Sequence, residues 1–348
     1  MSDAPNSPSA NASGKQRLQA ILTALGPLLA LVVVLVAFGI ADKYQRGERA
    51  AFLSVNNIRN ISEQTVVVAM AALGMTIIII AGGIDLAAGT ALALASTTLA
   101  WCLKNDYGVA VGLAAALGVG ALTGFINGTL TSLLGVVPFI ITLGTMTIYQ
   151  GVAKLIANET TVQPNFAQVP EWLPNLTFSP VKPQWLIYPI LPNFSTSVWI
   201  VAALAVLMAA MLKYTIFGRY IFAVGSNEAT ARLCGINIRL VKIGVYTLAG
   251  LFVGAAGILQ FTRLTSGDPT GGVGLELKII AAVVIGGGSL SGGRGSILGT
   301  IAGAAIMVVI ASGCNILGIS NSIQDIVIGA IIIAAVTLDQ FRQRRLAS

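Results

Sequence analysis

The chain has 348 residues, of which 55% are hydrophobic and only 9% are charged, with a mean hydropathy of +0.86. A soluble domain carries roughly 25% charged residues, so this composition excludes a water-soluble globular protein. The 39 glycines suit closely packed membrane helices. We therefore expect an all-α polytopic membrane protein. The net charge of +7 is expected in loops that face the cytoplasm and anionic membrane lipid, not nucleic acid.

The sequence contains no histidine, which removes histidine-based catalysis, most zinc sites and a histidine proton relay. The three cysteines, Cys102, Cys234 and Cys314, lie in or near different apolar segments and lack the spacing of metal ligands. They are expected to pack as small apolar side chains. The sequence thus predicts neither a metal site nor a cofactor.

Residues 1–17 are small and polar and are expected to form a disordered cytoplasmic tail. Charge-free apolar runs then recur, and residues 18–340 are expected to form a transmembrane domain of about ten helices. The run 107–153 is long enough for two of them, with a break near residues 135–138. The expected spans are 18–41, 64–84, 86–103, the two halves of 107–153, 197–212, 243–262, 275–285, 297–311 and 323–338.

Basic residues predict the orientation. The loop 213–242 carries five of them against one acid, Glu228, and the tail 341–348 carries three arginines. With ten spans, both termini and this loop fall on one side, which the positive-inside rule makes cytoplasmic. Residues 42–60 hold four basic residues yet fall outside, against the rule. Residues 158–196, rich in Pro, Asn and Trp, are expected to form an external loop.

An internal repeat can be aligned in two ways. GGIDL at 82–86 matches GGVGL at 271–275, and GGIDLAAG at 82–89 matches GGGSLSGG at 286–293. The first pairing places the copies on opposite faces of the membrane and implies two inverted five-helix halves, as in many transporters. The second places them on the same face. We favour inversion because ten spans divide into two odd halves of five.

The stretch GSLSGGRGS at 288–296 contains LSGG, four letters of the signature of ATP-binding-cassette ATPases, and its glycines include the spacing of a phosphate loop. A phosphate loop also needs a strand before it, a helix after it, and a Lys followed by Ser or Thr after the last glycine. Arg294 and Gly295 stand in those two places. We interpret the stretch as a cytoplasmic turn between closely packed helices, and we expect that the chain does not bind ATP.

Several polar residues fall inside or beside apolar runs. Asp85 follows two glycines and opens a helix, so it is predicted to cap that helix, to line a substrate path, or to do both. The others should face protein or a water-filled cavity, where they would bond neighbouring helices or contact a polar solute such as a sugar. The predicted translocation pathway comprises Asp85, Asn127, Gln150, Glu276, Asn315 and Gln324.

Within the basic loop, GSNEATARLCGI at 225–236 opens with a flexible Gly-Ser pair, continues with the capping-type Asn227 and ends a short predicted helix at Gly235. A short cytoplasmic helix between membrane helices is either a docking element for a soluble partner or an ordinary surface helix. The residues alone leave both readings open.

Four strings together resemble the permease subunits of bacterial sugar ATP-binding-cassette importers of the ribose and xylose type, over residues 50–340: AGGIDLAAGTALAL, NGTLTSLLGVVPFIITLGTMTIYQG, FGRYIFAVGSNEATARLCGINI and AAVVIGGGSLSGGRGSILGT. The resemblance implies two permease copies around the pathway, a cytoplasmic ATPase docked on the coupling loop, and a periplasmic binding protein that delivers sugar. Thr230 stands where a second alanine is usual. The residues that match the coupling-loop pattern are Gly225, Asn227, Glu228, Ala231, Gly235 and Ile236.

We therefore expect a permease subunit, in a bacterial inner membrane, of an importer for ribose or a related monosaccharide. It would catalyse no covalent chemistry, and its partner would hydrolyse ATP. The alternative is an ion-coupled secondary transporter of a small polar solute, which would need acids or histidines placed for coupling. A membrane-embedded enzyme would need a catalytic or metal constellation that the sequence lacks.

Overall fold

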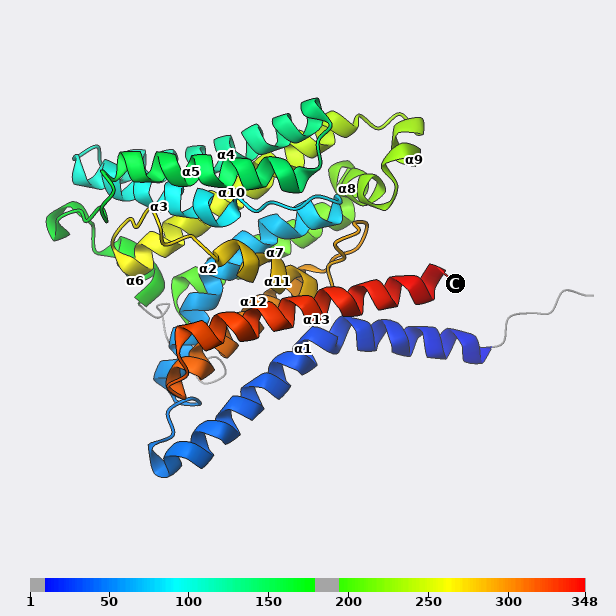
Figure 1. Ribbon diagram of the computed structural model, residues 1–348, viewed down its shortest axis with the longest axis horizontal. Helices are drawn as coiled ribbons and strands as arrows, with labels where there is room; N and C mark the ends of the chain where they lie inside the picture. Colours follow the sequence, from blue (N-terminus) through cyan, green and yellow to red (C-terminus); the bar gives the residue numbers. More distant parts are fainter. Residues whose placement is uncertain (1–9, 179–193, 348) are drawn as a thin grey trace, which may run out of the picture.

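The structure is a computed structural model that describes residues 10–178 and 194–347 (Figure 1). Apart from isolated bridge residues, among them the pair Val162 and Gly267, the regular structure in this described part is helical. Residues 1–9 of the expected tail lie outside it, as do residues 179–193 of the expected external loop. The elements are α1 Ala10–Arg46, η1 Gly47–Arg49, α2 Val55–Ile80, α3 Ala88–Lys104, α4 Val109–Leu134, α5 Pro138–Ile156, η2 Phe166–Gln168, α6 Trp172–Phe178, α7 Thr196–Tyr214, α8 Ile216–Ser226, α9 Glu228–Leu233, α10 Ile238–Leu264, α11 Leu275–Ile285, α12 Ile297–Ile316 and α13 Asn321–Ala347.

Seven helices of the described part are long and apolar enough to cross a membrane: α1, α2, α4, α5, α7, α10 and α12. The helices α3 and α11 are shorter because each begins only after a non-helical segment that contains glycines. Together with α13 they correspond to the ten expected spans. The prediction of an all-α polytopic membrane protein is confirmed.

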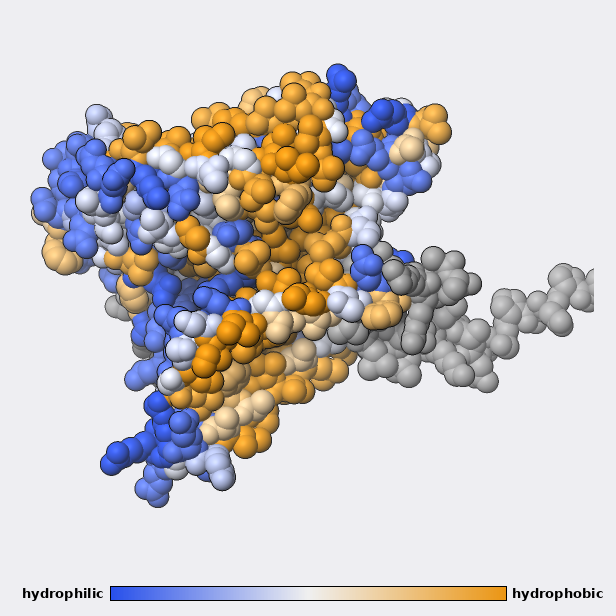
Figure 2. All heavy atoms as spheres, viewed as in Figure 1, coloured by the Kyte–Doolittle hydropathy of each residue, from blue (hydrophilic) through white to orange (hydrophobic). Residues whose placement is uncertain are grey.

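Figure 2 shows that hydrophobic side chains cover the middle of one face, while hydrophilic ones gather towards its ends. The helices α4, α5 and α7 contribute large exposed apolar side chains, among them Phe125, Ile140 and Leu207. In contrast, most of α2 is buried, and its apolar residues surround the helix on all sides. A helix that is apolar all round belongs in the interior, and an exposed apolar face belongs against lipid.

The packing of the helices follows the first of the two repeat alignments. The helix α2 packs against α10. The short helix α3, which follows α2, packs on α10, and the short helix α11, which follows α10, packs on α2. The next helices repeat the exchange, since α4 packs on α3 and α10 while α12 packs on α11 and α2. In Figure 1, α4 and α5 lie on one side of the body and α12 and α13 on the other. This arrangement favours two inverted halves.

The predicted start of the span 64–84 needs correction, because α2 begins about two turns earlier, at Val55. Ser54 accepts a hydrogen bond from the Asn57 N–H at 3.3 Å and caps the helix. One turn further on, Arg59 and the buried Glu63 form an ion pair of 2.9 Å. Because the two charges are paired along the helix, the helix continues through residues that hydropathy alone excludes.

The backbones of α4 and α10 approach each other closely. The buried face of α4 repeats small residues every three or four positions, including Gly120 and Gly124. A β-carbon on Gly124 would overlap the Tyr246 carbonyl oxygen, and one on Gly250 would overlap the Gly120 carbonyl oxygen. Glycines therefore let the two backbones touch, which is a common way to pack membrane helices.

Gly124→Ala is accordingly expected to destabilise the protein by about 1–3 kcal/mol, because the added methyl group must separate two packed backbones. Gly118→Ala on the same helix is the matched control, since nothing lies within 4 Å of a β-carbon there. Thermal aggregation of the purified variants in detergent measures the difference. Equal midpoints for the two variants would contradict the close packing.

Candidate functional site

A non-helical segment separates α2 from α3 and carries Asp85. The helix α2 ends with backbone hydrogen bonds from Gly82 to Ile79 and from Gly83 to Ile78. Gly82 has φ of +80°, a left-handed conformation that disfavours other residues. The chain then runs without helical structure to Ala88. The sequence GGID thus turns the chain back before it enters the short helix α3.

The short helices α3 and α11 meet at their N-terminal ends. Gly89, in the first turn of α3, packs so closely that a β-carbon would overlap the Gly272 carbonyl oxygen and the Glu276 carboxylate. Gly272 precedes α11, and Glu276 lies in its first turn. The positive ends of two helix dipoles therefore converge inside the protein, which is a common arrangement for a solute site at the centre of a transporter.

Asp85 belongs to a buried hydrogen-bonded group at this point. Its Oδ1 atom accepts from the Ala87 N–H at 2.9 Å and from the Asn127 amide at 3.2 Å. The Tyr149 hydroxyl donates to Asn127 Oδ1 at 2.9 Å and to the Thr123 carbonyl at 3.0 Å. Asp85, Asn127 and Tyr149, here called the Asp85 network, are 7%, 1% and 5% exposed. The network links the break to α4 and α5.

The predicted capping role of Asp85 needs a correction. The N-cap of α3 is Ala87, which makes no side-chain cap bond. Asp85 lies two residues earlier and holds the N–H of that cap residue, so it stabilises the approach to the helix instead of its first turn. Its carboxylate is thus shared between the local turn and Asn127.

Two hydroxyl groups converge on the residue just before Asp85. The Tyr246 hydroxyl of α10 donates to the Ile84 carbonyl at 3.2 Å, and the Thr142 hydroxyl of α5 donates to the same oxygen at 3.3 Å. The sequence analysis did not predict these residues or Tyr149. A signal was present for α5, because its buried residues Thr142, Thr145, Tyr149 and Ala153 recur at helical spacing.

The structure places Gln150 and Glu276 apart from the Asp85 network. Gln150 follows Tyr149 on α5 and is half-buried, but one residue along a helix turns the side chain by about 100°. Glu276 Oε1 accepts from the Gly274 N–H at 3.0 Å, and Oε2 is buried without a hydrogen-bond partner among the described residues. Glu276 therefore lies at the meeting point of α3 and α11 without joining the network.

Asn315 and Gln324 form a third, separate group. The Gln324 amide donates to Asn315 Oδ1 at 2.7 Å and to the Ile319 carbonyl at 3.1 Å. These residues lie where α12 gives way to α13. The two side chains join neighbouring helices, which is one of the two roles that the sequence left open, and they do not contact Asp85.

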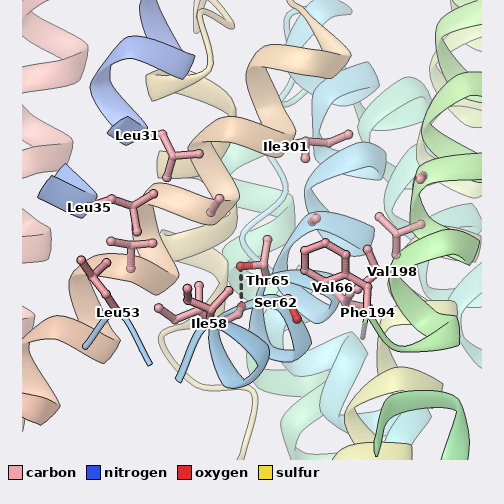
Figure 3. A pocket seen from close by; sticks show the side chains of 16 residues that line it. Leu31, Leu35, Leu53, Ile58, Ser62, Thr65, Val66, Phe194, Val198 and Ile301 are labelled. Atoms are coloured by element: carbon pink, nitrogen blue, oxygen red, sulfur yellow. Dashed lines mark hydrogen bonds between the residues drawn. The ribbon is translucent and has the colours of Figure 1, made fainter. Parts of the chain in front are cut away.

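A crevice of about 380 Å³ lies between α1, α2, α7 and α12 (Figure 3). Leu31, Leu35, Phe194 and Val198 are among the side chains that line it. Among the described residues that line it, Ser62 and Thr65 carry hydroxyls, and both donate to carbonyls of α2 itself, at 2.7 Å. The other described side chains of the lining are apolar, so the crevice suits hydrocarbon better than a sugar.

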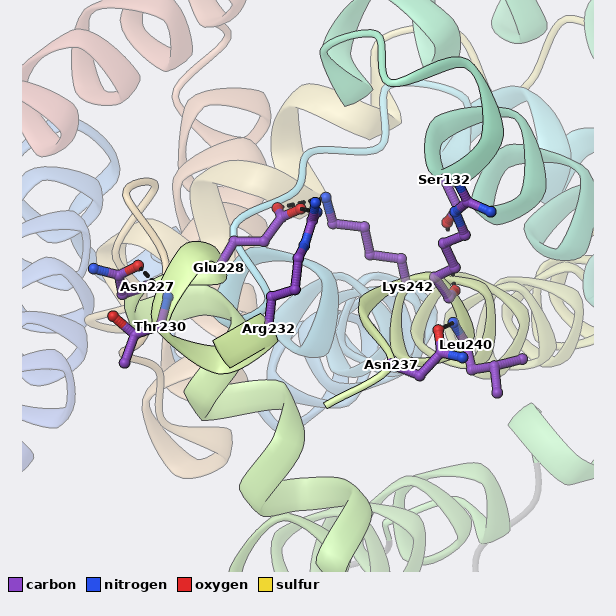
Figure 4. Close-up of polar contacts among 9 residues, drawn as sticks. Ser132, Asn227, Glu228, Thr230, Arg232, Asn237, Leu240 and Lys242 are labelled. Atoms are coloured by element: carbon purple, nitrogen blue, oxygen red, sulfur yellow. Dashed lines mark hydrogen bonds and ion pairs between the residues drawn. The ribbon is translucent and has the colours of Figure 1, made fainter. Parts of the chain in front are cut away.

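The loop between α7 and α10 is ordered by its caps. Thr215 caps α8 through the Gly218 N–H at 3.0 Å, Asn227 caps α9 through the Thr230 N–H at 2.9 Å, and Asn237 caps α10 through the Leu240 N–H at 3.3 Å. The expected short helix is α9. Figure 4 shows it beside the start of α10. Each cap satisfies N–H groups that a helix start leaves free.

Ion pairs hold α9 in place. Glu228 accepts from Lys242 of α10 at 2.7 Å and from Arg232, one turn along α9, at 3.2 Å (Figure 4). Ala231 is buried, and Gly235 ends the turn with φ of +81°. Of the six predicted coupling residues, Asn227, Glu228, Ala231, Gly235 and Ile236 thus lie in or beside this helix.

The end of α9 exposes one large apolar side chain and, next to it, a thiol. Leu233 is 89% exposed. The adjacent Cys234 is exposed as well, so the prediction that it packs as a small apolar side chain is wrong, whereas Cys102 and Cys314 are buried as predicted. Leu233 is therefore an exposed apolar side chain on a loop whose charges are mostly basic.

Gly225 is the sixth predicted coupling residue, and the expectation of flexibility there is wrong. It lies in the last turn of α8, and a β-carbon on it would overlap the Ile80 carbonyl oxygen at the end of α2. Gly225 is therefore fixed between two packed backbones.

The stretch 288–296 lies between α11 and α12, as predicted for a turn. The Gly292 N–H donates to the Ser289 carbonyl at 2.9 Å, and Ser296 caps α12 through the Gly299 N–H at 3.1 Å. Helices flank it on both sides, so the strand that a phosphate loop requires before it is not present at this place.

Comparison with known families identifies the class of protein. Residues 57–336 match the family described as "Branched-chain amino acid transport system / permease component". The chain belongs to this family of membrane permeases, and the expected resemblance to permeases of ATP-binding-cassette importers is confirmed.

The relatives of this chain include several import permeases. The "Ribose import permease protein RbsC" of Escherichia coli (strain K12) is 40% identical, over 84% of this chain and 88% of that protein. The protein of the same name from Bacillus subtilis (strain 168) is 37% identical, over 92% and 94%. The "Fructose import permease protein FrcC" of Rhizobium meliloti is 34% identical, over 94% and 88%. No solved structure gives a significant match.

Proposed function

We propose that this permease imports a monosaccharide, ribose or a related pentose, and that a partner ATPase drives it. The names of the relatives support a sugar, although the family description mentions branched-chain amino acids. The chemistry of the site supports a sugar too. The Asp85 network combines an amide, a phenol and one carboxylate, which suit hydroxyl groups, whereas a zwitterionic amino acid calls for two opposite charges.

One observation carries the proposal: a hydrogen-bonded polar group lies buried where two short helices begin within an apolar body. Polar groups are expensive in hydrocarbon and are usually functional there. We assign the sugar path to Asp85, Asn127 and Tyr149, and we place Glu276 on the same path at the meeting point of α3 and α11. Asn315 and Gln324 then act as a link between α12 and α13, and Gln150 lies at the edge of the path.

The partners follow from the same proposal. A cytoplasmic ATPase docks on α9, a periplasmic binding protein delivers the sugar to the opposite face, and a second copy of the chain completes the pathway within the inner membrane. Both termini then face the cytoplasm. The ATPase would drive the chain between an outward-open and an inward-open state by binding the two states with different affinity. This permease would itself break no covalent bond.

Uptake of labelled ribose tests the proposal, in cells that express the chain with its genomic partners. Uptake is expected to survive an ionophore that collapses the proton gradient and to stop when ATP is depleted. Loss of uptake with the gradient, while ATP stays high, would favour an ion-coupled secondary transporter instead. Labelled fructose is the matched second substrate. If the cells take up fructose and not ribose, the proposed substrate changes from a pentose to a hexose.

A further inference from the structure

Three segments far apart in the sequence meet backbone to backbone beside α9. The Gly293 N–H, in the stretch 288–296, donates to the Ile80 carbonyl at 2.8 Å. A β-carbon on Gly225 would overlap that carbonyl, and one on Gly292 would lie 2.5 Å from the Gly225 carbonyl oxygen and 3.0 Å from Gly82 Cα. We call Gly82, Gly225, Gly292 and Gly293 the glycine junction.

The glycine junction connects α9 to the break that carries Asp85. Gly225 lies two residues before Asn227, the cap of α9. Gly82 lies three residues before Asp85. The backbone hydrogen bonds that end α2 stop at Gly83, and the chain from there to Asp85 is not helical. Because no side chain separates the backbones, a displacement of one segment must move the others.

A second connection runs from α9 through α10. Glu228 of α9 is paired with Lys242 at 2.7 Å, and the Lys242 side chain is only 20% exposed, which limits its freedom. Tyr246 lies one helical turn beyond Lys242. The hydroxyl of the buried Tyr246 donates to the Ile84 carbonyl at 3.2 Å. A β-carbon on Gly83 would lie 2.6 Å from the hydroxyl oxygen of Tyr246.

Both connections therefore end in residues 82–85. The first reaches Gly82 through backbone contact, and the second reaches Gly83 and Ile84 through the Tyr246 hydroxyl. Residues 83–85 lie outside the helical hydrogen bonding of α2 and α3, and segments without regular structure rearrange more easily than helices.

We propose that Tyr246 is a positioning residue which, together with the glycine junction, transmits the movement of α9 to residues 82–85 and thereby to the Asp85 network. This inference rests on the proposed function, since it supposes an ATPase on α9 and a sugar at Asp85. It also gives the stretch 288–296 a role: its glycines serve close backbone contact, and its likeness to an ATPase signature is a coincidence of letters.

Tyr246→Phe tests the transmission with the smallest change in shape, because it removes only one of the two hydroxyls that bond the Ile84 carbonyl and leaves that of Thr142 in place. The variant is assayed as the assembled complex in nanodiscs, with the ATPase and with ribose-loaded binding protein. The ATPase is expected to co-purify in normal amount. The stimulation of ATP hydrolysis by the loaded binding protein, relative to hydrolysis without it, is expected to fall about five- to tenfold, which is the scale of a typical coupling between sites.

Glu228→Gln breaks the second connection at its other end and is expected to lower the same ratio. Tyr220→Phe is the matched control: Tyr220 is an exposed tyrosine of α8, 40% exposed, and the change there should leave the ratio unchanged. A normal ratio in Tyr246→Phe, or a loss of co-purification that accounts for the whole effect, would overturn the transmission. A wild-type complex that neither captures the ATPase nor responds to ribose-loaded binding protein would instead overturn the proposed function beneath it.

Discussion

Leu233→Glu is expected to release the partner ATPase from the permease. Leu233 is 89% exposed, so the carboxylate disturbs no packing in the isolated chain, and insertion and stability should stay normal. In the complex, the same carboxylate would be buried against the partner without a counter-charge. We expect capture of the ATPase to weaken at least about tenfold, equivalent to 1.4 kcal/mol, and ribose uptake to fall with it.

Two variants make this result specific. Leu233→Met keeps an apolar side chain of similar size at the same place and should capture the ATPase normally. Leu240→Glu puts the same charge on the first turn of α10, where the leucine is 66% exposed, and tests whether any carboxylate near the loop has the effect. Undiminished capture by Leu233→Glu would show that α9 is an ordinary surface helix.

Asn127→Ala is expected to lower ribose uptake more than tenfold while leaving capture of the ATPase intact. The Asn127 amide bridges Asp85 and Tyr149, so its removal takes one hydrogen bond from a buried carboxylate and one from a buried phenol. The loss of each bond costs about 0.5–3 kcal/mol, and in the path it also removes a contact available to the sugar.

Asn315→Ala is the matched control for that change. It removes an identical side chain that was also predicted to lie in the translocation pathway. Asn315, however, lies at the connection of α12 and α13. Uptake by Asn315→Ala should stay near the wild-type rate. A comparable loss in both variants would mean that the effect comes from stability in general, and the assignment of the path to the Asp85 network would then be wrong.

The outline of the fold could be predicted from the sequence because the cost of placing charge in hydrocarbon acts on each residue separately. Charge-free runs therefore located the helices, and Asn227 and Gly235 marked the two ends of α9. The predicted start of a helix was wrong where charged residues of that helix form an ion pair. The ion pair of Arg59 with Glu63 extends α2 beyond the run that hydropathy defined.

The site was predictable only in part, because it depends on contacts between distant segments. Asp85 and Asn127 are 42 residues apart and do meet, whereas Gln150 was chosen in place of its neighbour Tyr149. The prediction included the amide of Gln150 and did not consider the phenol of Tyr149, yet the face of α5 decides which of the two side chains reaches the interior. Gly225 shows the same limit, since flexibility and tight backbone contact require the same residue.

The position of Cys234 has a practical consequence for kinetics. It is the exposed cysteine next to Leu233, while the other two thiols of the chain are buried within the helices. A maleimide dye can therefore be attached beside the proposed docking surface of the unmodified protein, with no cysteine removed or introduced. Its emission can follow the arrival and departure of the ATPase in real time, so that association and release rates are measured on the natural sequence.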